Sequence, residues 1–507
     1  MSIFKTASMI VALTLIGRLL GFFRNVYVSN LYGTSAASDA FYTAVTIPQT
    51  LFLVVPGAIN AVLIPTMRGL MEKEERTGVL YNKVLTVVFA AFLAMAVLGV
   101  VFAREIAWLM GAQENTLEMT ADMLRWMWPS AVFIGLAGLW SSVCNAHQHF
   151  FTPTLGTVAN GALVIVSMYL LVPLYGPDGL AMATTLGYLA AMLTMLPTLR
   201  RFGYRHRLSF AWKEDEALRS MGERVVPILI GAVVSQATTF LERGFANGLG
   251  AGNVSALANA NQIVQMPMAI FVGAFTLPLF PLLASHVKRG EMDQMKQILQ
   301  KGLAYLLILL LPVTAGLILY AEPIVRLAFQ RGEFGELSVA LTAWALPFYG
   351  LGLYGMAARD LITRAFYALD NTRTPVVVGV IGIAVYAVAN WLLIPWMGHG
   401  GIALGMAVSV LFQSVLLFAL LWRKVGAPIN RSFVWTALRT LAACAVMSGG
   451  VLLADAWLSA LPLWCYLLLG VTGGALLYFA ALFALREPLV AELVQKLRRR
   501  STPAANR

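Results

Sequence analysis

The sequence predicts an all-α polytopic membrane protein of about fourteen transmembrane helices, in two pseudo-symmetric six-helix lobes followed by two C-terminal helices. Composition, long apolar runs and an internal repeat support this fold. Of the 507 residues, 59% are hydrophobic and only 12% are charged, whereas soluble proteins carry about 25% charged residues. Apolar runs of about 20 residues recur along the chain, and each is long enough to cross a hydrocarbon core about 30 Å thick.

Each apolar run is expected to form a helix, because backbone polar groups in lipid must be satisfied within their own segment. The runs are too long and too uniformly apolar for the alternating strands of a β-barrel. The expected spans lie near residues 7–29, 40–66, 80–102, 125–146, 153–173, 178–199, 223–247, 255–283, 302–320, 338–366, 374–396, 401–423, 434–455 and 462–484.

The internal repeat relates stretches of the chain about 220 residues apart. In the clearest match, Gly176 and Gly179 of GPDGLAMA recur as Gly398 and Gly401 of GHGGIALG. Two more sets keep the same order along the chain: Ala146, Thr152 and Pro153 match Ala368, Thr374 and Pro375, and Arg24, Gly33 and Pro48 match Arg243, Gly252 and Pro267. Parallel halves of this kind are typical of transporters whose substrate path lies between them.

The repeat and the distribution of charge divide the chain. We expect an N-terminal lobe at 1–199, a basic cytoplasmic linker at 200–222, a C-terminal lobe at 223–424, a helix pair at 425–485 and a basic cytoplasmic tail at 486–507. Basic residues gather in the linker, the tail and alternate loops, which is the positive-inside asymmetry and places both termini in the cytoplasm. The net charge of +12 is therefore interpreted as topology and contact with anionic lipids, not as a nucleic-acid surface.

Several functional classes have no support in the sequence. It has no Walker loop, GxSxG or HExxH motif, and no soluble domain of any size. Its three cysteines, Cys144, Cys444 and Cys465, sit in apolar segments without metal or disulfide spacing. Arg18 and Arg24 follow the first apolar stretch without a cleavage site, so this stretch is expected to be the first span. We expect a transporter with no cofactor and no metal, rather than an enzyme.

The most informative residues are charges inside the expected spans. An ionisable side chain at the bilayer centre costs about 2.5–3.5 kcal/mol on insertion scales, so it usually faces a cavity or a partner. These residues are Arg18, Arg24, Asp39, Glu242, Arg243, Arg359 and Asp360. Three interpretations stay open: snorkelling to the interface, ion pairs between helices, and a cationic cavity. Arginine donates two hydrogen bonds at once to phosphate, which favours an anionic substrate over a cationic drug.

Prolines recur in the second and eighth spans. They are Pro48, Pro56 and Pro65 in one and Pro267, Pro278 and Pro281 in the other. We expect them to break both helices, which suits gating, although packing kinks would give the same pattern.

Three motifs resemble one family. GRLLGFFRNVYVSNLYGTSAASDAFYTA at 17–44, PIVRLAFQRGEF at 323–334 and RAFYALDNTRTPV at 364–376 are similar to signatures of the MurJ (MviN) lipid II flippases of the multidrug/oligosaccharidyl-lipid/polysaccharide exporter superfamily. The resemblance implies translocation of the undecaprenyl-linked peptidoglycan precursor across the bacterial cytoplasmic membrane by alternating access. It also implies a central cationic cavity, and a lipid-tail groove formed by the last two helices.

The resemblance also assigns residues. Arg18, Arg24 and Asp39 match cavity residues of the family. The chain departs from the family near Leu51 and at Gln262, where many relatives carry arginine. The substrate-binding candidates that complete the set are Gln262, Arg243 and Arg359, and the candidates for ion coupling or gating are Glu242 and Asp360. Expected partners are the lipid-linked precursor, membrane lipids and the peptidoglycan polymerase machinery.

Three alternatives remain. A flippase for another undecaprenyl-linked oligosaccharide would share the fold and the arginines. A cation-coupled drug exporter of the same superfamily would favour acidic residues in its cavity. A membrane scaffold that transports nothing would need no charges inside the membrane.

Overall fold

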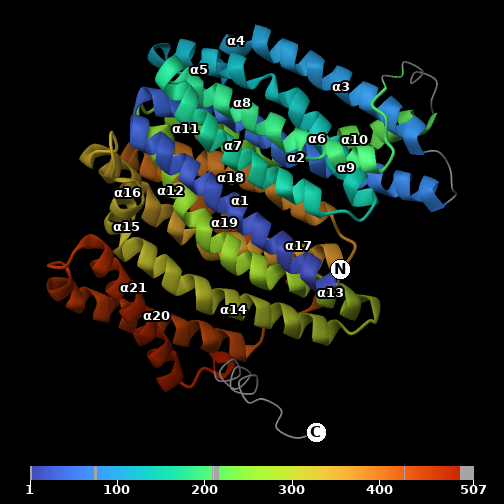
Figure 1. Ribbon diagram of the computed structural model, residues 1–507. Helices are drawn as coiled ribbons and strands as arrows, with labels where there is room; N and C mark the ends of the chain where they lie inside the picture. Colours follow the sequence, from blue (N-terminus) through green and yellow to red (C-terminus); the bar gives the residue numbers. More distant parts are fainter. Residues whose placement is uncertain (1–2, 73–76, 208, 210–215, 428, 491–507) are drawn as a thin grey trace, which may run out of the picture. The chain divides into compact units, whose positions relative to one another are not determined.

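The computed structural model describes residues 3–72, 77–207, 209, 216–427 and 429–490 (Figure 1). These residues form α-helices and one π-helix, and no strand occurs among them. The predicted fold class is therefore confirmed.

Most expected spans correspond to long apolar helices. Among the described residues, twelve helices are long and apolar enough to cross a membrane, and a pair bent by 40°, Glu336–Leu351 with Leu353–Ala368, makes up to thirteen. The expected span at 255–283 falls on three shorter consecutive elements and is not among these helices. The number fourteen and the two-lobe layout stay predictions.

The chain packs as two compact units. Unit 1 runs to Ser255 and includes 331–335, and unit 2 holds 256–330 and the chain from Glu336 onward. Unit 1 contains α1 (Ile3–Tyr32), α2 (Ala36–Glu72), α3 (Thr77–Val101), α4 (Ala103–Leu109), α5 (Glu114–Met127), α6 (Ser130–Ala146), α7 (Phe151–Tyr175), α8 (Asp178–Leu193), α9 (Leu196–Arg201), α10 (Glu216–Ser235), α11 (Ala237–Asn247) and the start of α12 (Asn253–Pro267).

Unit 2 continues α12 and ends with the two C-terminal helices. Its elements are η1 (Met268–Val272), α13 (Gly273–Lys288), α14 (Met292–Leu319), α15 (Ala321–Phe329), α16 (Glu336–Leu351), α17 (Leu353–Ala368), α18 (Arg373–Met397), α19 (His399–Val425), α20 (Arg431–Leu458) and α21 (Leu463–Ala484). The boundaries predicted from sequence stay predictions, and most of the basic tail, 491–507, lies outside the described residues.

Apolar side chains form the core of each unit. In unit 1, Met67, Tyr81, Leu139 and Val143 lie in one buried cluster shared by α2, α3 and α6. In unit 2, Tyr478 of α21 packs beside α20 and donates its hydroxyl to the Ile308 carbonyl of α14 at 2.6 Å. Because the tyrosine hydroxyl reaches a backbone acceptor, this ring can be buried without losing a hydrogen bond.

The sequence repeat extends to local backbone geometry. Gly176 and Gly398 end α7 and α18 with φ of 58° and 57°, in the left-handed region that glycine adopts readily. A Cβ on Gly179 would lie 2.7 Å from the Leu171 carbonyl carbon, and one on Gly401 would lie 2.8 Å from that of Leu393. The close approach of α8 to α7, and of α19 to α18, thus requires glycine at equivalent positions.

The prolines behave differently in the two copies. α2 continues as one α-helix through Pro48, Pro56 and Pro65, so the predicted break in the second span is wrong. In the eighth span, α12 ends at Pro267 and the chain passes into η1. The predicted break is confirmed at Pro267, which lacks the N–H that would continue the helix ladder, but α13 continues as an α-helix through Pro278 and Pro281.

Candidate functional site

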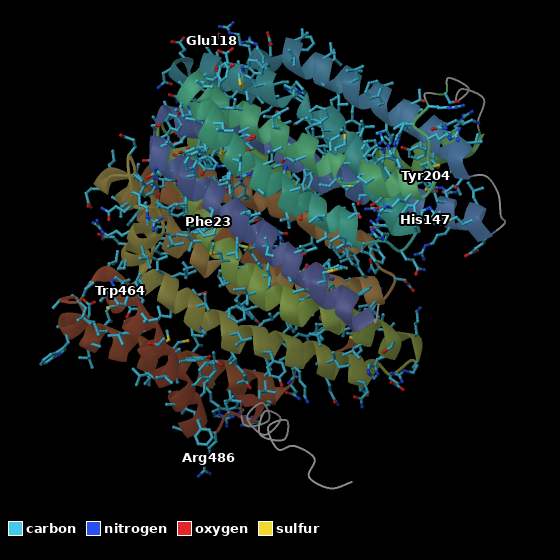
Figure 2. All side chains as sticks on the ribbon, in the orientation of Figure 1. Phe23, Glu118, His147, Tyr204, Trp464 and Arg486 are labelled. Carbon is cyan, nitrogen blue, oxygen red and sulfur yellow. The ribbon has the colours of Figure 1, made fainter. Side chains whose placement is uncertain are left out.

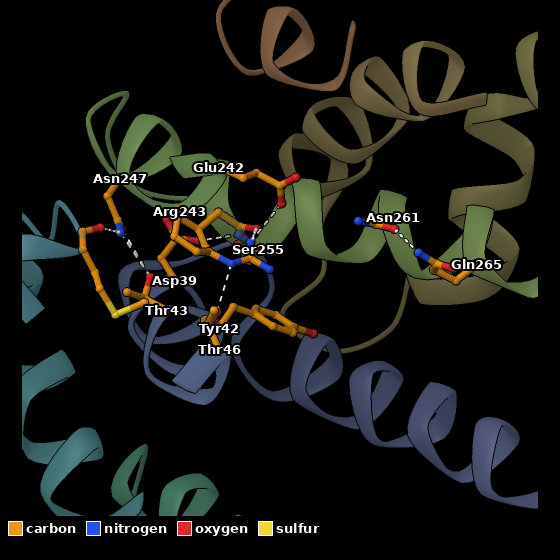
Figure 3. A network of polar contacts seen from close by, with 12 residues as sticks. Asp39, Tyr42, Thr43, Thr46, Glu242, Arg243, Asn247, Ser255, Asn261 and Gln265 are labelled. Carbon is orange, nitrogen blue, oxygen red and sulfur yellow. Dashed lines mark hydrogen bonds and ion pairs between the residues drawn. The ribbon is translucent and has the colours of Figure 1, made fainter. Parts of the chain in front are cut away.

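Asp39, in the first turn of α2, is buried and bonded through both carboxylate oxygens. Its side chain is 2% exposed. Oδ2 accepts the Gly252 N–H at 2.5 Å and Oδ1 accepts the Ser255 N–H at 2.8 Å (Figure 3). The first N–H groups of a helix have no partner within it, and the helix dipole favours an anion there. Asp39 therefore caps the start of α12 from another helix.

Glycine makes this cap possible. Gly252 precedes α12 with φ of +92°, a conformation that side chains with a Cβ disfavour. In this conformation its N–H points at Asp39. Gly33, its counterpart in the repeat, lies between α1 and α2 and also has positive φ, at 54°.

Arg243 on α11 joins the same network. Its Nε donates to the Thr46 hydroxyl of α2 at 3.2 Å, and Nη1 donates to the Val254 carbonyl at 3.4 Å. Nη1 also lies 3.6 Å from Oε1 of Glu242 (Figure 3). These two adjacent long side chains therefore approach each other closely enough to form an ion pair. With side-chain exposures of 11% and 6%, both charges are largely removed from solvent.

Asn247, one turn further along α11, has a role that was not predicted from the sequence. Its amide nitrogen donates to the Thr43 hydroxyl at 3.2 Å and to the Met110 carbonyl at 2.9 Å. Gly111 follows Met110, and a Cβ there would lie 2.8 Å from the Gly244 carbonyl oxygen. The amide thus ties α11 to the start of α2 and the end of α4. The presence of an asparagine in an apolar segment was the sequence signal that could have identified this role.

Arg18 and Arg24 lie on α1. Arg18 is exposed and Arg24 is half-buried. Nε and Nη2 of Arg24 donate to the Asn25 amide oxygen at 3.2 and 3.1 Å. The exposed apolar stripe of α1 is formed by Val11, Leu15, Leu19 and Phe23. Residue 24 lies roughly opposite this stripe at 100° per residue, so Arg24 points away from the face suited to lipid.

The other candidates lie in unit 2. Arg359 on α17 is half-buried and donates to the Gln413 side chain of α19 at 3.4 Å. Asp360 accepts from Arg364, one turn along the same helix, at 3.1 Å. Gln262 is half-buried on α12. The structure therefore brings Asp39, Glu242 and Arg243 together. Within the described ranges, no three His, Cys, Asp or Glu side chains gather as metal ligands.

A second polar cluster in unit 1 holds the start of the basic linker. His147 Nε2 lies 3.0 Å from the Tyr204 hydroxyl (Figure 2), and the His147 ring stacks on Phe202 with centroids 4.3 Å apart. His206 Nδ1 lies 2.6 Å from the Tyr81 hydroxyl. Burial lowers the pKa of His147, and burial together with the positive charge of Arg200 lowers the pKa of His206. Both shifts favour the neutral form of the ring.

Comparison with known proteins gives one family. The family model described as lipid II flippase MurJ matches residues 28–471. The lipid II flippase MurJ of Burkholderia cenocepacia is 28% identical over 438 residues, covering 82% of this chain and 83% of that protein. The probable lipid II flippase MurJ of Vibrio cholerae is 28% identical over 469 residues, covering 88% of each.

Solved structures agree on the fold. A lipid II flippase MurJ in an inward closed conformation matches with a TM-score of 0.80 at 20% identity, covering 96% of this chain and 99% of that one. An inward-facing multidrug resistance MATE family transporter of the MOP superfamily matches with a TM-score of 0.68 at 14% identity, covering 83% and 98%. At these identities the likeness establishes shared architecture.

Proposed function

Because the chain belongs to the lipid II flippase MurJ family, whose model matches residues 28–471, we propose that it moves lipid II from the inner to the outer leaflet of the bacterial cytoplasmic membrane. The family match over most of the chain carries this proposal. The positive-inside pattern supports cytoplasmic termini. The expected partners are lipid II, membrane lipids and peptidoglycan polymerases, and nucleic acid is not expected.

The physical problem is the polar head of the substrate. A disaccharide-peptide-pyrophosphate cannot enter hydrocarbon, because each polar group buried without a partner costs free energy. We place the pyrophosphate against Arg24 and Arg18 in a wet cationic cavity, where arginine replaces lost hydration. Arg359 and Gln262 complete the proposed binding set, and the isoprenoid tail follows the groove beside α20 and α21.

Transport then requires the cavity to open on one side of the membrane at a time. The sequence suggested Asp39 and Arg243 as substrate-binding residues. Because both are largely removed from solvent and their bonds join the starts of α2 and α12 to α11, we assign them to closure instead. Glu242 and Asp360 are the proposed coupling or gating acids. Each elementary charge moved through the membrane field gains about 2.3 kcal/mol per 100 mV, so the potential could drive the reset.

Complementation tests the proposal. The gene is expressed in a bacterium depleted of its own lipid II flippase, alongside Arg24→Ala and the control Arg104→Ala, whose side chain is 60% exposed and paired with Glu118. We expect wild type and Arg104→Ala to restore growth and Arg24→Ala to fail. The expected loss of flipping is at least about tenfold, because a charged hydrogen bond contributes about 1.5–3 kcal/mol.

Other outcomes have distinct meanings. Rescue by Arg24→Ala would retain the substrate and remove Arg24 from the site. Failure of well-expressed wild type would exclude lipid II and favour another undecaprenyl-linked oligosaccharide, because the arginines suit any pyrophosphate.

A further inference from the structure

A pair of asparagines joins α2 and α6 of unit 1, which lie side by side (Figure 1). Asn145 Nδ2 donates to the Asn60 amide oxygen at 3.3 Å, and it also lies 3.5 Å from the Ser141 hydroxyl, one turn back along α6. Both asparagines fall within expected spans, 40–66 and 125–146. A polar side chain inside a span faces a partner or a water-filled cavity, so this asparagine pair needs an explanation as much as the charges do.

The asparagine pair uses only part of its hydrogen-bonding capacity. Within the described part of the chain, the Asn60 amide nitrogen and the Asn145 amide oxygen have no hydrogen-bond partner. Both residues are half-buried, so these atoms remain accessible. The pair thus offers a donor on one helix and an acceptor on the other. A secondary amide, with one N–H and one C=O, is the complementary ligand.

The surface of α2 beside the asparagine pair differs from a surface that faces lipid. Gly57 and Ala61 lie one turn apart and form an exposed strip next to Asn60. A Cβ on Gly57 would meet nothing within 4 Å. The exposed stripe of α1 is instead formed by large apolar side chains. The strip on α2 therefore leaves room for an extended backbone to lie against the two amides.

The asparagine pair lies far along α2 from the short turn at 33–35 that joins this helix to α1. At 1.5 Å per residue, Asn60 is about 36 Å from the start of α2, whereas Arg24 and Arg18 are about 12 and 21 Å from the end of α1. The pair is thus about 15–24 Å farther from the turn than the arginines. A peptide of about five residues spans about 17 Å when extended. A head group whose pyrophosphate contacts the arginines would therefore bring its peptide to the pair.

We propose that Asn60 and Asn145 bind the backbone of the peptide of lipid II. The Asn60 amide nitrogen donates to a peptide carbonyl, and the Asn145 amide oxygen accepts a peptide N–H. This inference rests on the proposed function and adds the part of the substrate that the pair recognises. The arginines hold the pyrophosphate through charge, whereas the asparagines hold a neutral backbone. The pair thus discriminates by the presence of a peptide and not by the lipid or the pyrophosphate.

Equilibrium binding to the purified full-length protein in detergent tests the proposal. The three ligands are lipid II, the same lipid-linked disaccharide without its peptide, and undecaprenyl pyrophosphate. Asn60→Ala and Asn145→Ala should each weaken lipid II binding about three- to tenfold, the range for one or two neutral hydrogen bonds. Both variants should bind the other two ligands as wild type does, which also shows that they are folded. Arg24→Ala should weaken all three ligands, because each carries the pyrophosphate.

Asn82→Ala is the matched control. Asn82 is also a half-buried asparagine of unit 1, and its amide oxygen accepts the Arg207 N–H at 3.1 Å. This variant should leave all three affinities unchanged. Equal weakening of all three ligands by Asn60→Ala would indicate a packing role and overturn the proposal.

Equal wild-type affinity for lipid II and its peptide-free form would also overturn the proposal, but lipid II would remain the substrate. Failure of wild type to bind any of the three ligands would instead contradict the proposed function, and this inference with it. The two failures are therefore distinguishable.

Discussion

The two proline-containing helices of the repeat share a sequence feature and differ in structure. Pro48 lies inside the continuous helix α2, whereas its counterpart Pro267 ends α12 and is followed by the π-helix η1. α2 is closely packed at one of its prolines. A Cβ on Gly138 of α6 would lie 3.4 Å from the Pro56 Cα, so α6 packs closely against α2 at a proline. A proline within a helix thus permits a break in the hydrogen-bond ladder without requiring one.

The starts of α2 and α12 also differ, in whether they carry an acidic residue. Asp39 in the first turn of α2 caps α12, whereas the position matching Asp39 in the second copy is Ala258. The first copy therefore supplies an acid that holds the second copy's helix start, and the second copy supplies none in return. A π-helix is rare and is found frequently at functional sites. In the second copy, the start of α12 is thus capped by a residue of the first copy, and the α-helical hydrogen bonding changes after Pro267. This combination suits the moving part of a transporter.

The largest effect should come from removing the cap. Asp39→Ala leaves the buried Gly252 and Ser255 N–H groups without an acceptor and should lower the free energy of unfolding by about 3–5 kcal/mol, the sum of two charged hydrogen bonds. Asp39→Asn keeps one acceptor oxygen and should lose about half as much. Denaturant unfolding of purified protein measures both. If Asp39→Ala unfolds like wild type, the cap contributes no stability and the asymmetry has no energetic basis.

A smaller effect should separate the two prolines. Pro267→Ala restores an N–H where α12 ends, so it should strengthen the helix there and slow lipid II flipping about fivefold, equivalent to about 1 kcal/mol. Pro48→Ala is the matched control and should leave the rate within a factor of about two, because α2 is already continuous. Flipping assays in proteoliposomes give both rates. Equal slowing by the two variants would remove the distinction between the copies.

The sequence predicted what depends on composition and spacing. Hydropathy located the long helices, and the repeat matched Gly176 with Gly398, which the structure shows ending their helices with nearly equal φ. Charges inside apolar segments led to Asp39, Glu242 and Arg243, which do lie together. Their geometry depends on contacts between residues more than 200 positions apart, as between Asp39 and Ser255, and no local pattern encodes these. For the same reason Asn247 and the cap on α12 were missed.

The smallest expected effect is a difference in pH dependence between the segments that follow α9 and α19. After α9, neutral His147 and His206 hold the linker through Tyr204 and Tyr81. After α19, Asn430 and Gln300 form the equivalent link through two amide hydrogen bonds at 2.7 and 3.3 Å. An amide does not titrate, whereas a histidine does. The first link should therefore respond to pH and the second should not.

The sign of this pH dependence follows from the direction of the two histidine pKa shifts. Because the pKa of each histidine is lowered from 6.5 in the folded state, the unfolded linker binds more protons, and stability rises with pH in this range. The link is complete above pH 6.5 and weakens as pH falls through 6.5 toward the lowered values. Hydrogen exchange should show Tyr204 and its neighbours opening faster at acidic pH, after correction for intrinsic rates, while the backbone near Asn430 changes little. His147→Gln with His206→Gln should remove the difference. Equal acid opening at both links would show that a general loss of structure, rather than these two rings, is responsible.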